Sequence, residues 1–534
     1  MKKTNFFWVQ VALMFICGLT PYVASAQDTD MSRYILTPPA PKTPQINGAR
    51  IFGARPGSEF LFTVVATGNR PMAFSAEGLP SGLKLNSESG RITGKVAKAD
   101  EYMVKLKATN SLGVNERVLH IVIGDKIALT PPMGWNSWNC WGNTVSQEKV
   151  LSSAKALVAK GLANYGWCSI NIDDGWQGIR GGKFNGIMPN KKFTDMKKLA
   201  DDIHNMGLKI GVYSGPWVGT YAGHIGSNAD NEDGTYETVK AGKHNEFYRL
   251  EEPDNRKNWY HSKYSFVIND SKQFEDWGID YLKYDWDPND VYNTKEMHDA
   301  LGKLKRDIVY SISNSAPYAD ASQWAKYTNS WRTTGDIVDT WESVSKIGFN
   351  QERWLPFSGS GHWVDPDMLV VGMVGWGPQL HHTRLTADEQ YTHISLWSLL
   401  AAPLLIGGDV SQMDDFTINL LCNNEVNDVN QDPLGYMAVP IATNGDCVTY
   451  AKPLEDGSMA IGLFNKSNES QEVSFTFKNL GVRGKQIIRD LWRQKDLGEY
   501  TEKFSTTVAS HGVAFLKIYP GNSRDRFIGR VKKP

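Results

Sequence analysis

Aspartate residues follow several short apolar runs of the chain, and this pattern is the first sign of chemistry in the sequence. The aspartates that come after such runs are Asp173, Asp174, Asp285, Asp336, Asp365, Asp367 and Asp409. Two carboxyl groups in one cleft suit glycoside hydrolysis, in which one attacks the sugar or activates water while the other protonates the leaving oxygen. Aspartate also caps helices that follow strands, and this structural role explains any one member of the series but not so many of them.

Two other kinds of catalysis find little support in the sequence. Metal-assisted hydrolysis lacks an HxH or HExxH pattern, and His381, His382 and His393 come without a matching set of ligands. Acyl transfer lacks a GxSxG motif and a cysteine with an identifiable histidine partner. We therefore expect no metal site and no organic cofactor.

The aspartates lie within residues 126–435, where strand-like and helix-like segments alternate. Segments such as 148–160, 196–206 and 391–402 have helical character. The eight strand candidates are residues 133–135, 167–172, 208–213, 279–284, 308–312, 330–333, 363–365 and 403–406. This alternation predicts a (β/α)₈ TIM barrel, with a doubly wound open sheet as the alternative. Because the carboxyl ends of barrel strands meet at one face, the aspartates are expected to gather there.

On both sides of this region, strand-like runs replace the alternation of strands and helices, so the predicted fold is multidomain. Residues 45–125 contain short alternating runs, such as 102–108, and predict a small β-sandwich. Residues 436–522 return to strand-like runs and predict a C-terminal antiparallel β-sandwich. Proline-rich residues 27–44 are predicted to be a linker, and residues 523–534 a basic, solvated tail.

Residues 1–26 have the layout of a secretory signal peptide. Two lysines precede an apolar run at residues 6–19, and the small residues Ala24-Ser25-Ala26 form a cleavage site. An uncleaved membrane anchor is the alternative, but the apolar run is short for a membrane span. We expect export to the periplasm or the extracellular space, without a stable membrane anchor.

The composition excludes some partners. The 57 Lys and Arg residues nearly balance 58 Asp and Glu residues, and no basic block stands outside the last dozen residues, so we expect no nucleic-acid partner. The 18 Trp, 21 Tyr and 21 Phe residues favour carbohydrate stacking only slightly, because large cores use aromatic residues too. Four cysteines outside the signal peptide do not form a disulfide scaffold, and their pairing stays open, as does the oligomeric state.

Five motifs occur in order within residues 133–369. They are Met133-Gly134-Trp135-Asn136-Ser137-Trp138, Asn171-Ile172-Asp173-Asp174-Gly175-Trp176, Tyr281-Leu282-Lys283-Tyr284-Asp285, Trp331-Arg332-Thr333-Thr334-Gly335-Asp336-Ile337 and Asp365-Pro366-Asp367-Met368-Leu369. With residues 399–408, they resemble the α-galactosidase (melibiase) family, glycoside hydrolase family 27. The resemblance covers the barrel and, more loosely, the C-terminal sandwich. Residues 78–94 separately resemble Ig-like modules of secreted bacterial enzymes, so residues 45–125 are expected to be an Ig-like β-sandwich.

The resemblance implies a retaining mechanism with Asp285 as the nucleophile and Asp336 as the acid/base. Lys283 points to the same face of its strand as Asp285 and is expected to keep that carboxylate ionised or to bind a sugar hydroxyl. Asp336 must hold a proton, so we expect partial burial near another carboxylate to raise its pKa. The expected separation of the two carboxyl groups is roughly 5 to 5.5 Å, or somewhat longer.

The resemblance also assigns substrate-binding residues. Asp173 and Asp174 match the pair that accepts hydrogen bonds from the galactose 4- and 6-hydroxyls, and such fixed acceptors discriminate against the epimer. The other expected contacts are Asp367 as a further carboxylate, Trp138 as a stacking platform, Tyr213 as a wall, Lys283, Arg332 beside the 2-substituent, and Ser315 in the loop 313–318.

Three departures from the family pattern affect specificity. Residues 313–318 replace a Cys-x-Trp loop that senses the 2-substituent, so discrimination between 2-hydroxyl and 2-acetamido sugars stays open. Gly175 stands where the family often has cysteine, so a disulfide common in relatives is expected to be missing. The long insertions 217–264 and 371–384 are expected to reshape the outer subsites.

The expected function is that of an exported, retaining exo-α-galactosidase acting on α-galactoside oligosaccharides or glycans. An α-N-acetylgalactosaminidase and a β-L-arabinopyranosidase are the alternatives within the family, and Asp174, in place of a longer acid, disfavours the latter. A catalytically dead carbohydrate-binding protein is the alternative from another class, and the intact Asp285 and Asp336 disfavour it.

Overall fold

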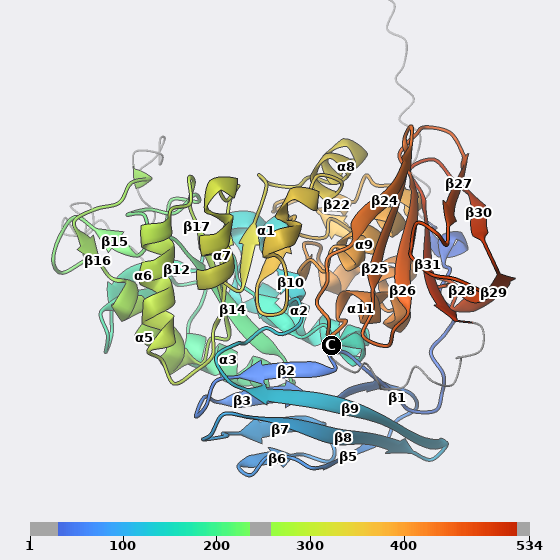
Figure 1. Ribbon diagram of the computed structural model, residues 1–534. Coiled ribbons are helices and arrows are strands. Elements are labelled where there is room, and N and C mark those ends of the chain that lie inside the picture. Colours follow the sequence, from blue (N-terminus) through green and yellow to red (C-terminus); the bar gives the residue numbers. More distant parts are fainter. Residues whose placement is uncertain (1–29, 235–257, 521–534) are drawn as a thin grey trace, which may run out of the picture.

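The computed structural model describes residues 30–234 and 258–520. The predicted signal peptide and basic tail lie outside these residues, as does the middle of the insertion 217–264. A central barrel is flanked by two β-sandwiches, one at each end of the chain (Figure 1). This arrangement confirms the predicted multidomain fold.

The central domain is a ring of eight parallel strands. In sheet order these are β20 (Trp363–Asp365), β19 (Ser330–Arg332), β18 (Val309–Ser313), β17 (Tyr281–Asp285), β14 (Lys209–Ser214), β11 (Ser169–Asn171), β10 (Met133–Asn136) and β23 (Leu404–Ile406). A parallel bridge between Leu369 and Ile406 connects the chain after β20 to β23 and closes the ring. The (β/α)₈ barrel is therefore confirmed, with all eight strands where they were predicted, and the open-sheet alternative is wrong.

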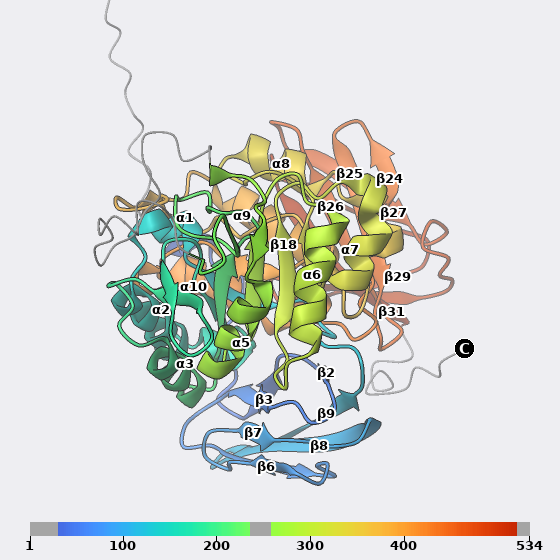
Figure 2. The same cartoon turned by 90° about the vertical axis from the view of Figure 1, so that its left-hand side faces the viewer.

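Helices surround the ring and cover the outer faces of its strands (Figure 2). They are α1 (Trp138–Trp141), α2 (Gln147–Ala159), α3 (Met196–Asn205), α5 (Val267–Trp277), α6 (Val291–Gly302), α7 (Ala321–Tyr327), α8 (Trp341–Gly348), α9 (Ala387–Leu399), α10 (Asp415–Leu421) and α11 (Asn424–Asn430). Side chains at their N-termini satisfy otherwise unpaired backbone N–H groups: Asp195 caps α3, Asp290 caps α6, and Thr386 with Glu389 forms a capping box on α9.

The N-terminal domain is a β-sandwich, as predicted. One sheet contains β2 (Ile51–Ala54), β9 (Gly113–Ile123), β8 (Asp100–Asn110) and β5 (Ala73–Glu77); the other contains β3 (Phe60–Thr63), β7 (Arg91–Gly94) and β6 (Leu83–Leu85), and β1 (Gln45–Asn47) pairs with β4 (Val65–Thr67). Val104, Leu106 and Ala108 alternate along β8 and enter the core between the sheets. Strand periodicity therefore indicated the buried face correctly.

The C-terminal domain is an antiparallel β-sandwich, also as predicted. Its large sheet contains β24 (Val439–Asn444), β25 (Cys447–Pro453), β26 (Met459–Asn465), β31 (Val513–Pro520), β28 (Gln486–Asp490) and β29 (Lys495–Tyr500), and β27 (Gln471–Thr476) pairs with β30 (Lys503–Val508). Val473, Phe475 and Phe504 from the small sheet pack in the core. Helix α9 of the barrel packs against β26 and β31.

The predicted linker is anchored along its described part. The Tyr391 hydroxyl on α9 donates to the Tyr34 carbonyl (2.7 Å), and the Asn423 amide before α11 donates to the Thr37 hydroxyl (2.9 Å). Residues 30–44 contain one short 3₁₀ helix, Ser32–Tyr34, and no strand. The segment leads into the Ig-like sandwich and lies fixed on the barrel.

The Ig-like sandwich lies beneath the amino-terminal ends of the barrel strands (Figures 1 and 2). Arg55 pairs with Asp307 (2.5 Å), just before β18, and the Thr63 hydroxyl donates to the Gly207 carbonyl (2.8 Å), just before β14. Because the carboxyl ends of the strands form the opposite face of a barrel, this sandwich lies away from the predicted site.

Candidate active site

The predicted carboxylates gather at the carboxyl-terminal face of the barrel. Lys283 on β17 donates to Asp173 after β11 (2.8 Å), and the Tyr213 hydroxyl on β14 donates to Asp285 at the end of β17 (3.0 Å). These bonds join three neighbouring strands. The convergence expected from the sequence is therefore present.

Asp285 is a buried carboxylate with one free oxygen. Its Oδ2 accepts the Tyr213 hydrogen bond, while its Oδ1 has no hydrogen-bond partner among residues 30–234 and 258–520. Burial raises the pKa of Asp285 to about 6, although the positive charges of Lys283 and Arg332 oppose that rise. A buried carboxylate oxygen without a donor is costly, so such an atom is typical of a group held for reaction.

Lys283 favours the ionised form of Asp285 through its positive charge, as expected, while its contact with a sugar hydroxyl stays a prediction. Its ammonium pairs directly with Asp173 (2.8 Å), and no direct bond to Asp285 is present among the described residues. Burial works against the charged ammonium, but Asp173 and Asp285 outweigh this and raise the pKa of Lys283. Lys283 therefore stays charged and supports ionised Asp285 through its field rather than by contact.

The expected protonation of Asp336 was wrong for the free protein. Its side chain is 61% exposed, and Arg332 donates to its Oδ1 (2.6 Å). Burial alone would raise the pKa of Asp336, but Arg332 and Lys283 outweigh it and hold the pKa below its ordinary value. The sequence analysis placed Arg332 beside the sugar 2-substituent and did not predict that this buried residue pairs with Asp336.

Asp173 and Asp174 lie in hydrogen-bonded sockets. Asp173 Oδ2 accepts from the Asn136 amide (2.9 Å) as well as from Lys283. Asp174 accepts from the Thr220 hydroxyl (2.9 Å) and from the Ala222 backbone N–H (2.8 Å). Burial raises the pKa of Asp174 to about 7 despite these two donors. Asn136, Thr220 and Ala222 were not predicted; Asn136 lies in the first motif, whereas Thr220 and Ala222 lie in the insertion, where no pattern indicated them.

Asp367 holds a loop. Its Oδ2 accepts from the Ile337 backbone N–H (2.8 Å) and its Oδ1 from the Met368 N–H (2.9 Å), while Arg332 lies 3.6 Å from Oδ1. Because both oxygens bind backbone groups, Asp367 fixes the residue that follows Asp336. The structure thus gives Asp367 a supporting role next to the site, whereas its predicted contact with substrate stays a prediction.

Of the remaining predicted contacts, Trp138 and Tyr213 are packed into the protein, whereas Ser315 is exposed. Trp138 is partly buried against the Met368 and Leu405 cluster, and Tyr213 is buried with its hydroxyl on Asp285. Ser315 is exposed, and its backbone N–H donates to the Thr334 carbonyl (3.2 Å). The residue of this loop that reaches the site is Asn314, whose amide oxygen accepts from Arg332.

Two aspartates of the series have structural roles. Asp409 accepts from the Ser411 backbone N–H (3.0 Å) and caps the 3₁₀ helix Val410–Gln412, as the capping explanation predicts. Asp365 accepts from the backbone N–H of Asp367 (2.7 Å). Burial raises the pKa of Asp365 to about 7.

The insertion after β14 adds an aromatic cluster near the site. The rings of Trp217 and Trp259 stack with centroids 5.6 Å apart, and Tyr221 meets both edge-on, at 5.3 and 4.6 Å. The Val218 backbone N–H donates to the Tyr260 carbonyl (2.9 Å), so the returning chain packs beside the outgoing one. The expectation that this insertion reshapes the outer subsites stays a prediction.

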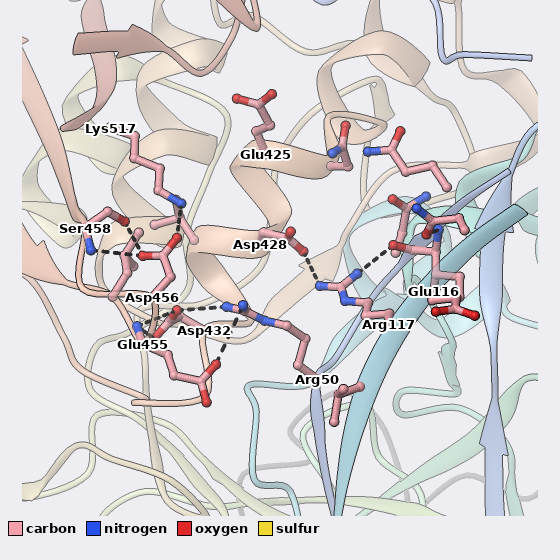
Figure 3. A pocket seen from close by; sticks show the side chains of 18 of the residues that line it. Arg50, Glu116, Arg117, Glu425, Asp428, Asp432, Glu455, Asp456, Ser458 and Lys517 are labelled. Atoms are coloured by element: carbon pink, nitrogen blue, oxygen red, sulfur yellow. Dashed lines mark hydrogen bonds and ion pairs between the residues drawn. The ribbon is translucent and has the colours of Figure 1, made fainter. Parts of the chain in front are cut away.

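A large groove of the described residues lies elsewhere. It has a volume of about 1220 Å³ at the junction of the Ig-like sandwich, the barrel and the C-terminal sandwich (Figure 3). The ion pairs that line it are Arg50–Asp432 (3.1 Å), Arg117–Asp428 (3.0 Å), Arg489–Glu425 (2.7 Å) and Lys517–Asp456 (2.6 Å). Three of these pairs cross a domain boundary, and Lys517–Asp456 lies within the C-terminal sandwich. The groove is therefore a charge-paired junction, distinct from the carboxylates at the strand ends.

Three features are absent from the described part of the chain. No group of three His, Cys, Asp or Glu side chains in residues 30–234 and 258–520 is arranged to hold a metal ion. Over the same residues, no helix has the length and apolar character of a membrane span. Cys140, Cys168, Cys422 and Cys447 are all unpaired.

A TIM barrel with acid side chains gathered at the carboxyl ends of its strands defines the class of protein, a barrel glycoside hydrolase. The comparisons with known proteins agree. Residues 130–242 and 255–432 match the family model for alpha galactosidase A, residues 444–518 match its C-terminal β-sandwich domain, and residues 23–123 match an Ig domain model. The chain belongs to the α-galactosidase (melibiase) family of glycoside hydrolases.

Individual relatives show the extent of the similarity. An α-galactosidase of Cyamopsis tetragonoloba is 33% identical over 82% of this chain and 95% of its own length, and α-galactosidase A of Cellvibrio japonicus is 32% identical over 74% and 93%. A Bacteroides fragilis structure solved as a candidate α-galactosidase/melibiase has a TM-score of 0.79 at 32% identity and covers 91% of this chain and 99% of its own. The β-L-arabinopyranosidase of Geobacillus stearothermophilus has a TM-score of 0.63 at 28% identity, over 74% and 98%.

Proposed function

We propose that the chain is an exported exo-α-galactosidase that releases terminal α-D-galactose with retention of configuration. The observation that carries this proposal is the free Oδ1 of buried Asp285, within a site that also contains Asp336 in the loop after β19, the next strand but one in the sheet. The α-galactosidase names of relatives across plants and bacteria support the substrate class. The amino-terminal sequence supports export.

In the first step, Asp285 Oδ1 attacks the anomeric carbon and the bond to the leaving oxygen breaks. Asp336 gives its proton to that oxygen, so the leaving alcohol departs neutral. In the second step, ionised Asp336 takes a proton from water, whose oxygen attacks the same carbon and releases Asp285 as a carboxylate. Two inversions give net retention, and both carboxyl groups return to their starting states.

The closed end of the site supports the exo mode. Asp173 and Asp174 are 2% and 1% exposed, and Thr220 with Ala222 closes the chain around Asp174. A chain end fits against such buried acceptors, whereas the interior of a polysaccharide chain does not. Carboxylates fixed in this way discriminate between axial and equatorial hydroxyls, because the wrong epimer leaves them unpaired.

The proposal is tested with p-nitrophenyl glycosides and purified residues 27–534. We expect turnover of the α-galactoside, loss of that turnover in Asp285→Asn, and normal turnover in Asp299→Asn, which removes a charge from an exposed position on α6. The α-2-acetamido galactoside and the β-L-arabinopyranoside are measured beside it, since a β-L-arabinopyranosidase is among the structural relatives. Preference for either of these substrates would refute the assigned specificity, and an inactive enzyme would refute the proposal as a whole.

A further inference from the structure

One terminal nitrogen of the Arg332 guanidinium donates to two acceptors from different loops. Its Nη2 donates to Asp336 Oδ1 (2.6 Å) and also to the amide oxygen of Asn314. Its Nε donates to the Thr334 carbonyl (3.1 Å), and its Nη1 lies 3.6 Å from Asp367. Since Nη2 carries two hydrogens, it donates one to each side chain, and the partial negative charge of the Asn314 oxygen offsets part of the positive charge that acts on Asp336.

Asn314 is held in place from both sides. Its backbone has φ +83°, in the left-handed region that asparagine tolerates, and the next N–H groups of the loop bond to the carbonyls of Thr334 (3.2 Å) and Arg332 (2.9 Å). Its amide also hydrogen-bonds the Tyr221 phenol. Tyr221 is in turn fixed by the rings of Trp217 and Trp259.

Tyr221 belongs to the segment that hydrogen-bonds to Asp174. Thr220 and Ala222, the residues on either side of it, are the two donors to Asp174. One continuous set of contacts therefore runs from the Asp174 socket through Tyr221 and Asn314 to Arg332.

We propose that Asn314 is a positioning residue for the acid/base Asp336: by accepting from the Arg332 nitrogen that binds Asp336, it limits how strongly the guanidinium favours the ionised carboxylate, and Tyr221 holds the Asn314 amide in that position. This inference rests on the proposed role of Asp336. It assigns a catalytic consequence to a loop in which the sequence indicated only substrate specificity.

Several other charged groups face Asp336 or its partner. Lys283 on β17 favours the ionised form of Asp336, and Asp285 on the same strand opposes it. Asp365 and Asp367, around the end of β20, act on Arg332 and raise its pKa together with Asp336 and Asp285. All of these groups are unchanged in the Asn314 variants. A difference between the pH profiles of those variants therefore reflects the contact between residue 314 and the Arg332 guanidinium.

The pH dependence of kcat/KM separates the two carboxyl groups. At pH values above the pKa values of both Asp285 and Asp336, kcat/KM is proportional to the small fraction of enzyme in which Asp336 keeps its proton. At pH values below both, kcat/KM is proportional to the fraction in which Asp285 is ionised. A change at Asp336 therefore moves the alkaline side of the profile and leaves the acid side in place. A change that only loosens the fold lowers both sides together.

The experiment measures kcat/KM from pH 2 to 9 with an α-galactosyl disaccharide, so that it includes pH values below both pKa values. Asn314→Gly removes the second acceptor on Nη2 without backbone strain, so the alkaline side falls about two- to tenfold. Asn314→Asp places a second negative charge on the guanidinium beside Asp336, so the alkaline side rises by a similar factor. Tyr221→Phe lowers the alkaline side by less than Asn314→Gly. Asn185→Gly, at another asparagine with positive φ (50°), is the matched control and leaves the profile unchanged.

The outcomes separate this inference from the proposed function. Opposite shifts of Asn314→Gly and Asn314→Asp on the alkaline side, absent when Asp336→Asn is also present, support the inference. Equal losses at all pH values, or shifts of the same sign, overturn it while the hydrolase assignment stands. Full activity of Asp336→Asn alone overturns the proposed role of Asp336 and the inference with it.

Discussion

Asp285 and Asp336 are the same residue type in different surroundings. Burial raises the pKa of Asp285 to about 6, whereas Arg332 and Lys283 hold the pKa of Asp336 below its ordinary value. The form that the proposed mechanism requires, with Asp285 ionised and Asp336 protonated, is therefore a minor form of the free protein. The sequence motifs indicated both residues, but their protonation depends on contacts between strands, which no local pattern reveals.

Removing the Tyr213 hydroxyl tests the environment of Asp285. This hydroxyl donates to Oδ2 (3.0 Å) and stabilises the ionised form, so Tyr213→Phe raises the pKa of Asp285 further. Ionised Asp285 is required below both pKa values, and kcat/KM on the acid side falls about two- to tenfold. The alkaline side is unchanged. A pH series of kcat/KM checks this, and an equal loss at both ends would show that Tyr213 acts only through packing.

Removing the acid at position 336 has an effect that depends on the leaving group. Asp336→Asn lowers turnover of an α-galactosyl disaccharide by about 10²- to 10⁴-fold, because its leaving oxygen needs a proton. An α-galactoside with a dinitrophenyl leaving group needs little protonation, so its first step is nearly unaffected. Added azide, which attacks without a base, restores turnover of that substrate. Equal losses on both substrates without azide rescue would contradict the acid/base role.

At the scale of elements, the barrel strands place the carboxylates, and the loops supply hydrogen-bond partners around them. The eight strands were predictable because apolar runs and helices alternate regularly, and Val104, Leu106 and Ala108 show the same predictability in the Ig-like sandwich. The donors to Asp174 were not predictable, since Thr220 and Ala222 lie in an insertion without periodicity. Asn314 was missed in favour of its neighbour Ser315, because the direction of a side chain in a left-handed loop does not follow from sequence.

The Asp174 socket gives a prediction for the insertion. Thr220→Val keeps the shape of the side chain but removes a donor from a carboxylate that is 1% exposed. The pKa of Asp174, already about 7, rises, and the unmet hydrogen bond costs about 1–3 kcal/mol. We expect a higher KM for α-galactosides at neutral pH. Thr220→Ser keeps the donor and is the control; an equal rise of KM in that variant would assign the effect to packing rather than to the hydrogen bond.

At the scale of the whole molecule, the Ig-like sandwich is docked against the barrel on the face opposite the site. Arg55 binds Asp307 through its side chain (2.5 Å) and its backbone N–H (2.9 Å), and Arg50 and Arg117 pair with the barrel near the charge-paired junction. Composition predicted a separate sandwich and a linker, but not this docking. Ion pairs between residues hundreds of positions apart leave no local pattern in a sequence.

Because the Ig-like sandwich docks away from the site, a substitution at this contact is predicted to change stability but not activity. Arg55→Ala removes a cation from a partly buried carboxylate, so the free energy of unfolding falls by about 1–3 kcal/mol. Activity in the folded enzyme is unchanged because the site lies on the other face. Lys95→Ala, which breaks an ion pair whose partners are both 50% exposed, costs less than about 1 kcal/mol and is the control. Denaturant titrations check both values, and a loss of kcat in Arg55→Ala would contradict the separation.

The central claim is that Asp285 forms a covalent bond to the sugar. The most direct test is to incubate the enzyme with a fluorinated α-galactosyl fluoride that forms the glycosyl-enzyme faster than it is hydrolysed, and to locate the label by mass spectrometry of peptides. We predict one fluorogalactosyl group, attached to Asp285 and absent from Asp285→Ala. A label on another residue, or no label while α-galactosides are hydrolysed with inversion, would contradict the account.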